Sequence, residues 1–194
     1  MLSDNDLSLI QKAREPVSDT QENRRIYTQF FENLMQEVRP YSLQENVSYH
    51  GFYTHTKQVG LFALDYALSL GKNPTPVLIA SAFHDCARMD DSYNETHAFQ
   101  AVPIAKQFLS SLPLDKTMSE EITTAIAKHT TGKKAENYIE ACLWDADRTR
   151  LSWERGYDSR FFNTEKGNTI ASLFYDDQQD YIQKQNEFLK ENFG

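Results

Sequence analysis

The chain has 194 residues, of which 40% are hydrophobic and 25% charged, and its formal net charge at pH 7 is −8. This composition is typical of globular proteins, and the length favours a single domain with a sizeable core over residues 1–194. An acidic surface repels phosphate backbones, which argues against long nucleic acid as a partner. Small phosphorylated molecules stay open as ligands, because a local positive or metal site overrides the global field.

The predicted elements are all helices, because long periodic segments are separated by few glycines and prolines. Gly71 predicts the end of one helix, and Thr75-Pro76 predicts the start of another. The latter is apolar on nearly all sides and therefore belongs at the centre of a bundle. No stretch alternates with the period of a strand. We predict an all-α bundle of about seven or eight helices. Their expected ranges, in chain order, are 5–14, 22–38, 54–70, 75–89, 97–111, 118–130, 136–153 and 177–190.

The cysteines and the N-terminus bear on where the protein works. Cys86 and Cys142 each stand alone in a helix-like run, which indicates buried thiols in a reducing compartment rather than a disulfide framework. The opening MLSDNDLSLIQKAREP holds no long apolar segment, and no run approaches the length of a membrane span. We therefore expect a cytoplasmic protein without membrane contact, as a monomer or a homodimer.

The histidines are few, and each falls near an end of a predicted helix, where side chains from different helices converge. They are His50, His55, His84, His97 and His129.

His84 and Asp85 close the most apolar predicted helix, in the stretch SAFHDCARMD. A buried, unpaired carboxylate is unfavourable, so Asp85 must be hydrogen-bonded, neutralised or bound to a cation. Alone, the pair is more typical of a capping aspartate beside a core histidine that bonds a backbone carbonyl. His55, at the start of an earlier helix, and Asp147, in the apolar run ACLWDADRTRL, favour a divalent metal instead. Imidazole with carboxylate suits Mn, Fe, Ni, Zn or Co better than Ca.

In order and spacing, His55, the His84-Asp85 pair and Asp147 resemble the H…HD…D pattern of the HD superfamily of metal-dependent phosphohydrolases. HTKQVGLFA is similar to the first-ligand helix of that family. LIASAFHDCAR is similar to its central apolar helix, and WDADRTRL to its last, where the aspartate of an Ala-Asp-Arg run binds metal. The resemblance spans about residues 50–155 and implies an all-α helical bundle of the HD-domain type.

The resemblance implies that His55, His84, Asp85 and Asp147 hold one divalent ion, with open positions for water and a substrate oxygen. Such an ion acts as a Lewis acid on a phosphoryl group and lowers the pKa of bound water. Asp145 is an alternative ligand, but the Ala-Asp-Arg match favours Asp147.

Some members of this superfamily hold a second ion, bridged by the aspartate of the His-Asp pair and completed by histidines that follow it. His97 in NETHAFQAV and His129 in AIAKHTTGK stand in that interval, so we expect them to bind a second metal or the substrate phosphate. The alternative for His97 is an exposed residue at a helix start. The alternative for His129 is a histidine favoured by the negative end of a helix dipole. His50 matches no ligand position of the family.

Two arginines are expected to act with Asp85 as catalytic residues, because a guanidinium matches the geometry of a phosphate. Arg88 lies one helical turn after His84, and Arg148 directly follows Asp147. Each has the alternative of pairing with an acid on the surface. The later stretch RGYDSRFFNTEKGN is aromatic and polar, which indicates a loop with a short helix. The sequence leaves open whether this stretch folds back over the cleft.

The resemblance implies a phosphohydrolase, either a phosphomonoesterase or a phosphodiesterase, that uses one or two metal ions and metal-activated water. Its substrate would be a small phosphorylated compound or a nucleotide. The same fold hosts di-iron oxygenases, and a non-catalytic nucleotide-binding sensor is a third interpretation. Bound iron with a charge-transfer spectrum would identify the oxygenase, and ligand-induced stabilisation without turnover would identify the sensor.

Overall fold

The structure is a computed structural model that describes residues 2–44, 51–92, 94–175 and 181–193, with the side chains at 152–155 and 181 excepted. These residues form helices and no β-strand, which confirms the predicted all-α class. None of the helices in this part of the chain is long and apolar enough to cross a membrane.

Nine α-helices lie within the described residues. They are α1 (Asp4–Gln11), α2 (Gln21–Val38), α3 (Lys57–Ser69), α4 (Thr75–Phe83), α5 (Thr96–Leu109), α6 (Lys116–Lys128), α7 (Tyr138–Arg155), α8 (Glu165–Tyr175) and α9 (Tyr181–Phe193). Three shorter elements are the 3-10 turns η1 (Arg39–Tyr41) and η4 (Ser159–Phe161) and the π-helical turn η3 (Phe52–Thr56).

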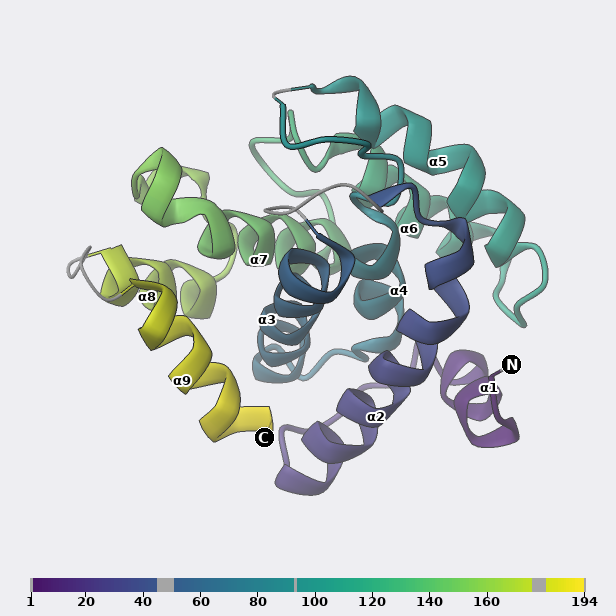
Figure 1. The fold of residues 1–194 in the computed structure, drawn as a ribbon. Coiled ribbons are helices and arrows are strands. Elements are labelled where there is room, and N and C mark those ends of the chain that lie inside the picture. Colours follow the sequence, from purple (N-terminus) through teal and green to yellow (C-terminus); the bar gives the residue numbers. More distant parts are fainter. Residues whose placement is uncertain (1, 45–50, 93, 176–180, 194) are drawn as a thin grey trace.

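Helices α3 and α4 form the centre of the molecule, with α7 and α8 on one side and α5 and α6 on the other (Figure 1). Every residue of α4 is buried, as its nearly uniform apolar sequence predicts for a central helix. Gly60 lets α2 approach α3 closely, because a Cβ at this position would lie 2.0 Å from the ring of Phe31. The central helices are therefore enclosed on several sides.

One hydrophobic cluster extends from Ile10 in α1 to Leu189 in α9. Its fully buried side chains include Phe62, Leu78 and Phe83, and burial of each stabilises the fold by about 1.5–3 kcal/mol. Apolar packing thus accounts for the scaffold, and the polar side chains buried within it need a separate explanation.

The central helix is shorter than the predicted range 75–89. It ends at Phe83 because the chain continues in tight turns, in which Cys86 N donates to Phe83 O and Arg88 N donates to Asp85 O. A helix would make these bonds one residue further back. The change of direction places the His-Asp pair at the end of the helix rather than along its side.

The C-terminal part contains more helix than the sequence predicts. The stretch after residue 155 includes the 3-10 turn η4 and the 11-residue helix α8. Thr164 caps α8, because its hydroxyl accepts a hydrogen bond from Gly167 N. Of the last predicted helix, 177–190, residues 177–180 lie outside the described part, and α9 continues to Phe193.

Candidate metal centre

Four of the predicted ligands meet where the central helices end. His84 and Asp85 directly follow α4, His55 lies in the π-helical turn that leads into α3, and Asp147 lies within α7. All four are buried, and the most accessible, Asp147, is only 8% exposed. Single π-helical turns are frequent at functional sites because the wider turn re-aims a side chain.

The first group of donors consists of His55, His84 and Asp147. The Nε2 atoms of the two histidines lie 3.2 Å apart. Asp147 Oδ1 lies 3.1 Å from His55 Nε2 and 3.9 Å from His84 Nε2. Two donors that bind one ion at about 2.1 Å and at right angles lie about 3.0 Å apart. The spacing of the three atoms fits ligation of a single ion.

A second group consists of His97, His129 and Asp85. The two Nε2 atoms lie 3.1 Å apart, and Asp85 Oδ1 lies 2.9 Å from that of His97 and 3.4 Å from that of His129. The other oxygen, Oδ2, lies 3.5 Å from His55 Nε2 and 3.7 Å from His84 Nε2. Asp85 therefore faces both groups, one oxygen to each, as a carboxylate that bridges two ions does.

Both additional histidines are buried at helix ends. His97 is the second residue of α5, and His129 follows α6. The alternative of an exposed helix-start residue for His97 is wrong, because its ring is enclosed. His129 does lie at a helix C-terminus, but its Nε2 is directed to Asp85.

The ring nitrogens explain why these clusters favour a cation. In His84, His97 and His129, Nδ1 hydrogen-bonds the backbone carbonyl three residues earlier, at 2.7 Å for His84 and 2.8 Å for His129. A carbonyl only accepts, so Nδ1 carries the proton and a neutral ring presents a lone pair at Nε2. The lone pairs of His97 and His129 then face each other, which is unfavourable without a positive charge between them.

The charges point the same way. Burial lowers the pKa of His84 to about 4, so its ring is neutral near pH 7. Burial opposes ionisation of Asp85, but the facing imidazoles hold its pKa well below the usual range. Burial also opposes protonation of His129, yet the Asp85 carboxylate raises its pKa. The centre thus combines ionised carboxylates with a neutral His84 ring and with a His129 ring whose pKa the Asp85 carboxylate raises, and a bound cation suits both.

Arg88 lies at the edge of the second group. Its Nε lies 3.3 Å from Asp85 Oδ2, and its Nη2 lies 3.3 Å from His97 Nε2. Its Nη1 donates to the carbonyl of Ser92 at 3.1 Å. The guanidinium therefore lies beside Asp85, the carboxylate that joins the two groups, as expected from the position of Arg88 one turn after His84.

Arg148 occupies a different place from Arg88. Although it directly follows Asp147, its guanidinium donates to the carbonyls of Phe161, at 2.6 Å, and Gly132. These bonds connect the loop after α6 with the loop after α7. A contact between Arg148 and a substrate phosphate stays a prediction.

Asp145 is committed to the same loop. Its carboxylate accepts hydrogen bonds from the backbone N–H groups of Asn163, at 2.9 Å, and Thr164, at 2.6 Å. Burial raises its pKa, while these donors oppose the shift. The alternative in which Asp145 replaces Asp147 as a ligand therefore has no support in the geometry.

A cavity of about 440 Å³ opens beside His129 and Asp147. Part of its lining is aromatic, with Tyr157, Phe161 and Phe162. The sequence shows this stretch as aromatic but assigns none of the three residues to the site. The available signal is the gathering of three rings directly after the helix that carries Asp147.

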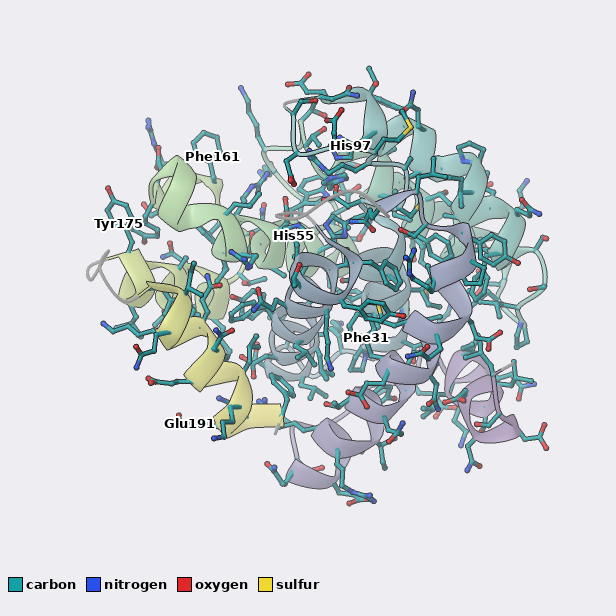
Figure 2. All side chains as sticks on the ribbon, in the orientation of Figure 1. Phe31, His55, His97, Phe161, Tyr175 and Glu191 are labelled. Carbon is teal, nitrogen blue, oxygen red and sulfur yellow. The ribbon has the colours of Figure 1, made fainter. Side chains whose placement is uncertain are left out.

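Figure 2 shows His55, His97 and Phe161 in the upper half of the molecule, with His55 near its centre. His50, which the sequence leaves out of the ligand set, lies outside the described residues.

Comparisons with known proteins agree with this geometry. A family model, the HD domain, matches residues 52–159, which include every candidate ligand from His55 to Asp147. A crystal structure of a predicted HD superfamily hydrolase from an uncultured Thermotogales bacterium is similar, with a TM-score of 0.59 and 22% identity. The match covers 82% of this chain and 91% of that chain, and at this identity it shows the fold. No curated protein matches the chain.

Proposed function

The chain belongs to the HD-domain family, and from this premise we propose that it is a metal-dependent phosphohydrolase acting on a small phosphorylated compound or a nucleotide. The observation that carries the proposal is the pair of buried donor groups joined by one carboxylate, with imidazole lone pairs facing each other in the second group. Such an arrangement is unfavourable for a purely structural cluster and favourable for two divalent cations.

The ligand assignment follows the direction of each donor. His55, His84 and Asp147, with Asp85 Oδ2, would hold one ion, and His97 and His129, with Asp85 Oδ1, would hold the other. This donor set of imidazoles and carboxylates suits Mn, Fe, Ni, Zn or Co. When bound, such ions polarise a phosphoryl oxygen and lower the pKa of water.

Residues of the chain orient the ligands, hold the shared carboxylate and limit the access of water. The Nδ1–H bonds of His84, His97 and His129 to backbone carbonyls fix the orientation of each ring. Arg88 holds the carboxylate of Asp85 from the side and offers N–H donors to a phosphate at the edge of the centre. The donors are buried, so little bulk water competes with the substrate.

A di-iron oxygenase is the second candidate, because four histidines and two aspartates also suit a pair of irons. A protein of this kind would consume O₂ and show a charge-transfer or mixed-valent spectrum when loaded with iron. A nucleotide sensor, the third candidate, would bind its ligand without turnover.

The proposal is tested by removing all metal with a chelator and restoring Mn, Fe, Ni, Zn or Co separately. Phosphate release is then measured from phosphomonoesters, phosphodiesters and nucleotides. We expect hydrolysis that depends on the added metal and is absent in Asp85→Asn. Glu191→Gln is the matched control, since Glu191 is an exposed carboxylate on α9 at the lower end of the molecule (Figure 2). Hydrolysis that persists in Asp85→Asn, or none with any metal, would contradict the proposal.

A further inference from the structure

We propose that the protein selects phosphate esters whose leaving group carries a planar heteroaromatic ring, as nucleoside monophosphates do. Tyr157, Phe161 and Phe162 form the wall against which this ring lies. The inference rests on the proposed function and adds the part of the substrate that is not phosphate.

The cavity beside the metal centre has the size and position for this part of the substrate. It begins at His129 and Asp147, one residue from each donor group, and its volume is about 440 Å³. Sites for small organic ligands typically enclose about 300–1,000 Å³. A phosphate held at the donor groups leaves this space for the rest of the ester.

The aromatic wall is built for a flat partner. The rings of Tyr157 and Phe162 lie 5.8 Å apart at an angle of 36°, and Tyr175 supports Tyr157 from 6.1 Å. Phe161 is 43% exposed, although most large apolar side chains of the molecule are buried. Aromatic faces bind any flat π-system, which favours a ring over a flexible aliphatic group.

A second wall of the cavity, formed by residues that follow α6, supplies polar groups for the edge of such a ring. Thr130, Thr131 and Lys133 follow His129 and line the cavity. The hydroxyl oxygen of Thr130 has no hydrogen-bond partner among the described residues, and it is buried. A buried hydroxyl without a hydrogen-bond partner is unfavourable, and a ring nitrogen or carbonyl of a heterocycle would supply that partner.

The two walls are held in place before any ligand binds. Arg148 bridges them, because its guanidinium donates to Gly132 O on one side and Phe161 O on the other. Gly132 lacks a Cβ, which allows its backbone to pack closely against the ring of Trp144; a Cβ here would lie 2.4 Å from that ring. Such a fixed pocket loses little conformational entropy on binding.

A second set of hydrogen bonds fixes the loop between α7 and α8, which carries the aromatic wall. The buried carboxylate of Asp145 accepts from the backbone of Asn163 and Thr164, and the hydroxyl of Tyr157 donates to Asn168 Oδ1 at 2.7 Å. Asp145 and Arg148 are thus positioning residues for the aromatic wall.

The test compares two substrates with the same primary phosphate ester, ribose 5-phosphate and adenosine 5′-monophosphate, in the metal-loaded protein. Stacking of a base on an aromatic side chain corresponds to a preference of about ten- to a hundredfold, so we expect kcat/KM for the nucleotide to be higher by this factor. Phe161→Ala should raise KM for the nucleotide and so bring the ratio of the two kcat/KM values close to one, whereas the control variant should keep the ratio of the wild type. Leu173→Ala, which removes an exposed side chain from α8, is the matched control.

Arg148→Lys separates positioning from contact with phosphate. A positioning role predicts a higher KM for the nucleotide with little change in kcat, and a smaller rise in KM for ribose 5-phosphate. A loss of kcat for both substrates would assign Arg148 to the phosphate and remove it from the wall.

The outcomes distinguish this inference from the proposed function. Equal kcat/KM for the two substrates would overturn the inference and leave the phosphohydrolase intact. If neither is hydrolysed, calorimetric titration of the metal-loaded protein decides. Tighter binding of the nucleotide that depends on Phe161 would support the ring site and contradict hydrolysis, whereas equal binding of both would overturn the ring site.

Discussion

Two buried polar clusters in this molecule use carboxylates in opposite ways. Asp65 in α3 is fully buried, and its Oδ1 lies 2.6 Å from Arg24 Nη2 and 2.7 Å from Lys166 Nζ. Arg24 also pairs with Asp19, so two acids meet two bases. The chain itself supplies the counter-charge, and the cluster connects α2, α3 and α8.

The metal centre lacks this balance. Asp85 and Asp147 lie near His84, whose burial keeps its pKa low and its ring neutral near pH 7, and Arg88 supplies a single positive charge beside Asp85. Within its described residues, the chain therefore does not fully neutralise the negative charge of the two carboxylates, and it does not supply a proton donor for every imidazole lone pair. The comparison teaches that burial of a carboxylate does not by itself mark a functional site; what marks it is a set of donors that the chain does not complete.

The largest effect is expected from Asp85→Ala, which removes the carboxylate shared by both donor groups. Metal content should fall to background and activity by at least about a thousandfold, because several kcal/mol of metal-derived stabilisation disappear. Helical content by circular dichroism should stay near that of the wild type, since the scaffold rests on apolar packing. Full metal occupancy in this variant would show that Asp85 is not a ligand.

A smaller effect is expected when only the second group is removed. His97→Ala combined with His129→Ala should lower the bound metal from two ions to one per chain, because His55, His84 and Asp147 keep the first site. Elemental analysis of the dialysed protein measures this ratio. An unchanged ratio would rule out the second site.

The variant Asp65→Ala tests the first of the two clusters, in which Asp65 pairs with Arg24 and Lys166. This variant leaves Arg24 and Lys166 without their shared acid, but Arg24 keeps Asp19 and Lys166 reaches solvent. We therefore expect the free energy of unfolding to fall by about 2–3 kcal/mol, at or below the lower end of the range of about 3–5 kcal/mol for a broken buried pair. Urea denaturation measures the loss. Metal content should not change, and a parallel loss of metal would show that the two clusters are coupled.

Removal of metal should destabilise the protein by a similar amount. At a metal concentration of about 100 times Kd, binding stabilises the fold by about 2.7 kcal/mol, so a chelator should lower Tm by about 5–10 °C. The same shift is expected in Asp65→Ala, because separate sites contribute additively. A chelator that leaves Tm unchanged in the wild type would show that the folded protein holds no tightly bound metal.

Much of the fold follows from the sequence. The apolar run over α4 predicts a central helix, and helical periodicity predicts most of the others. Helix α8 is expected only as a short helix within a loop, because its short apolar pattern directly follows an aromatic, polar stretch. The end of α4 at Phe83 is set by turns and backbone bonds that periodicity does not report.

The site, like the fold, is predicted only in part by the sequence. The resemblance to the HD family identifies the six residues that the structure brings together, but it treats Arg88 and Arg148 alike. The structure separates them, because Arg88 lies in the turn after α4 and faces Asp85. Arg148 follows Asp147 within a helix, where neighbouring side chains point about 100° apart. Such directions, and the loop contacts that depend on them, come only from three-dimensional packing.

Anomalous X-ray scattering from crystals grown with Mn²⁺ tests the central claim most directly. We predict one peak about 2.0–2.3 Å from the donors of His55, His84 and Asp147, and a second at the same distance from His97 and His129. Saturating Mn²⁺ that gives no peak between these side chains, or peaks only elsewhere on the molecule, would contradict the account.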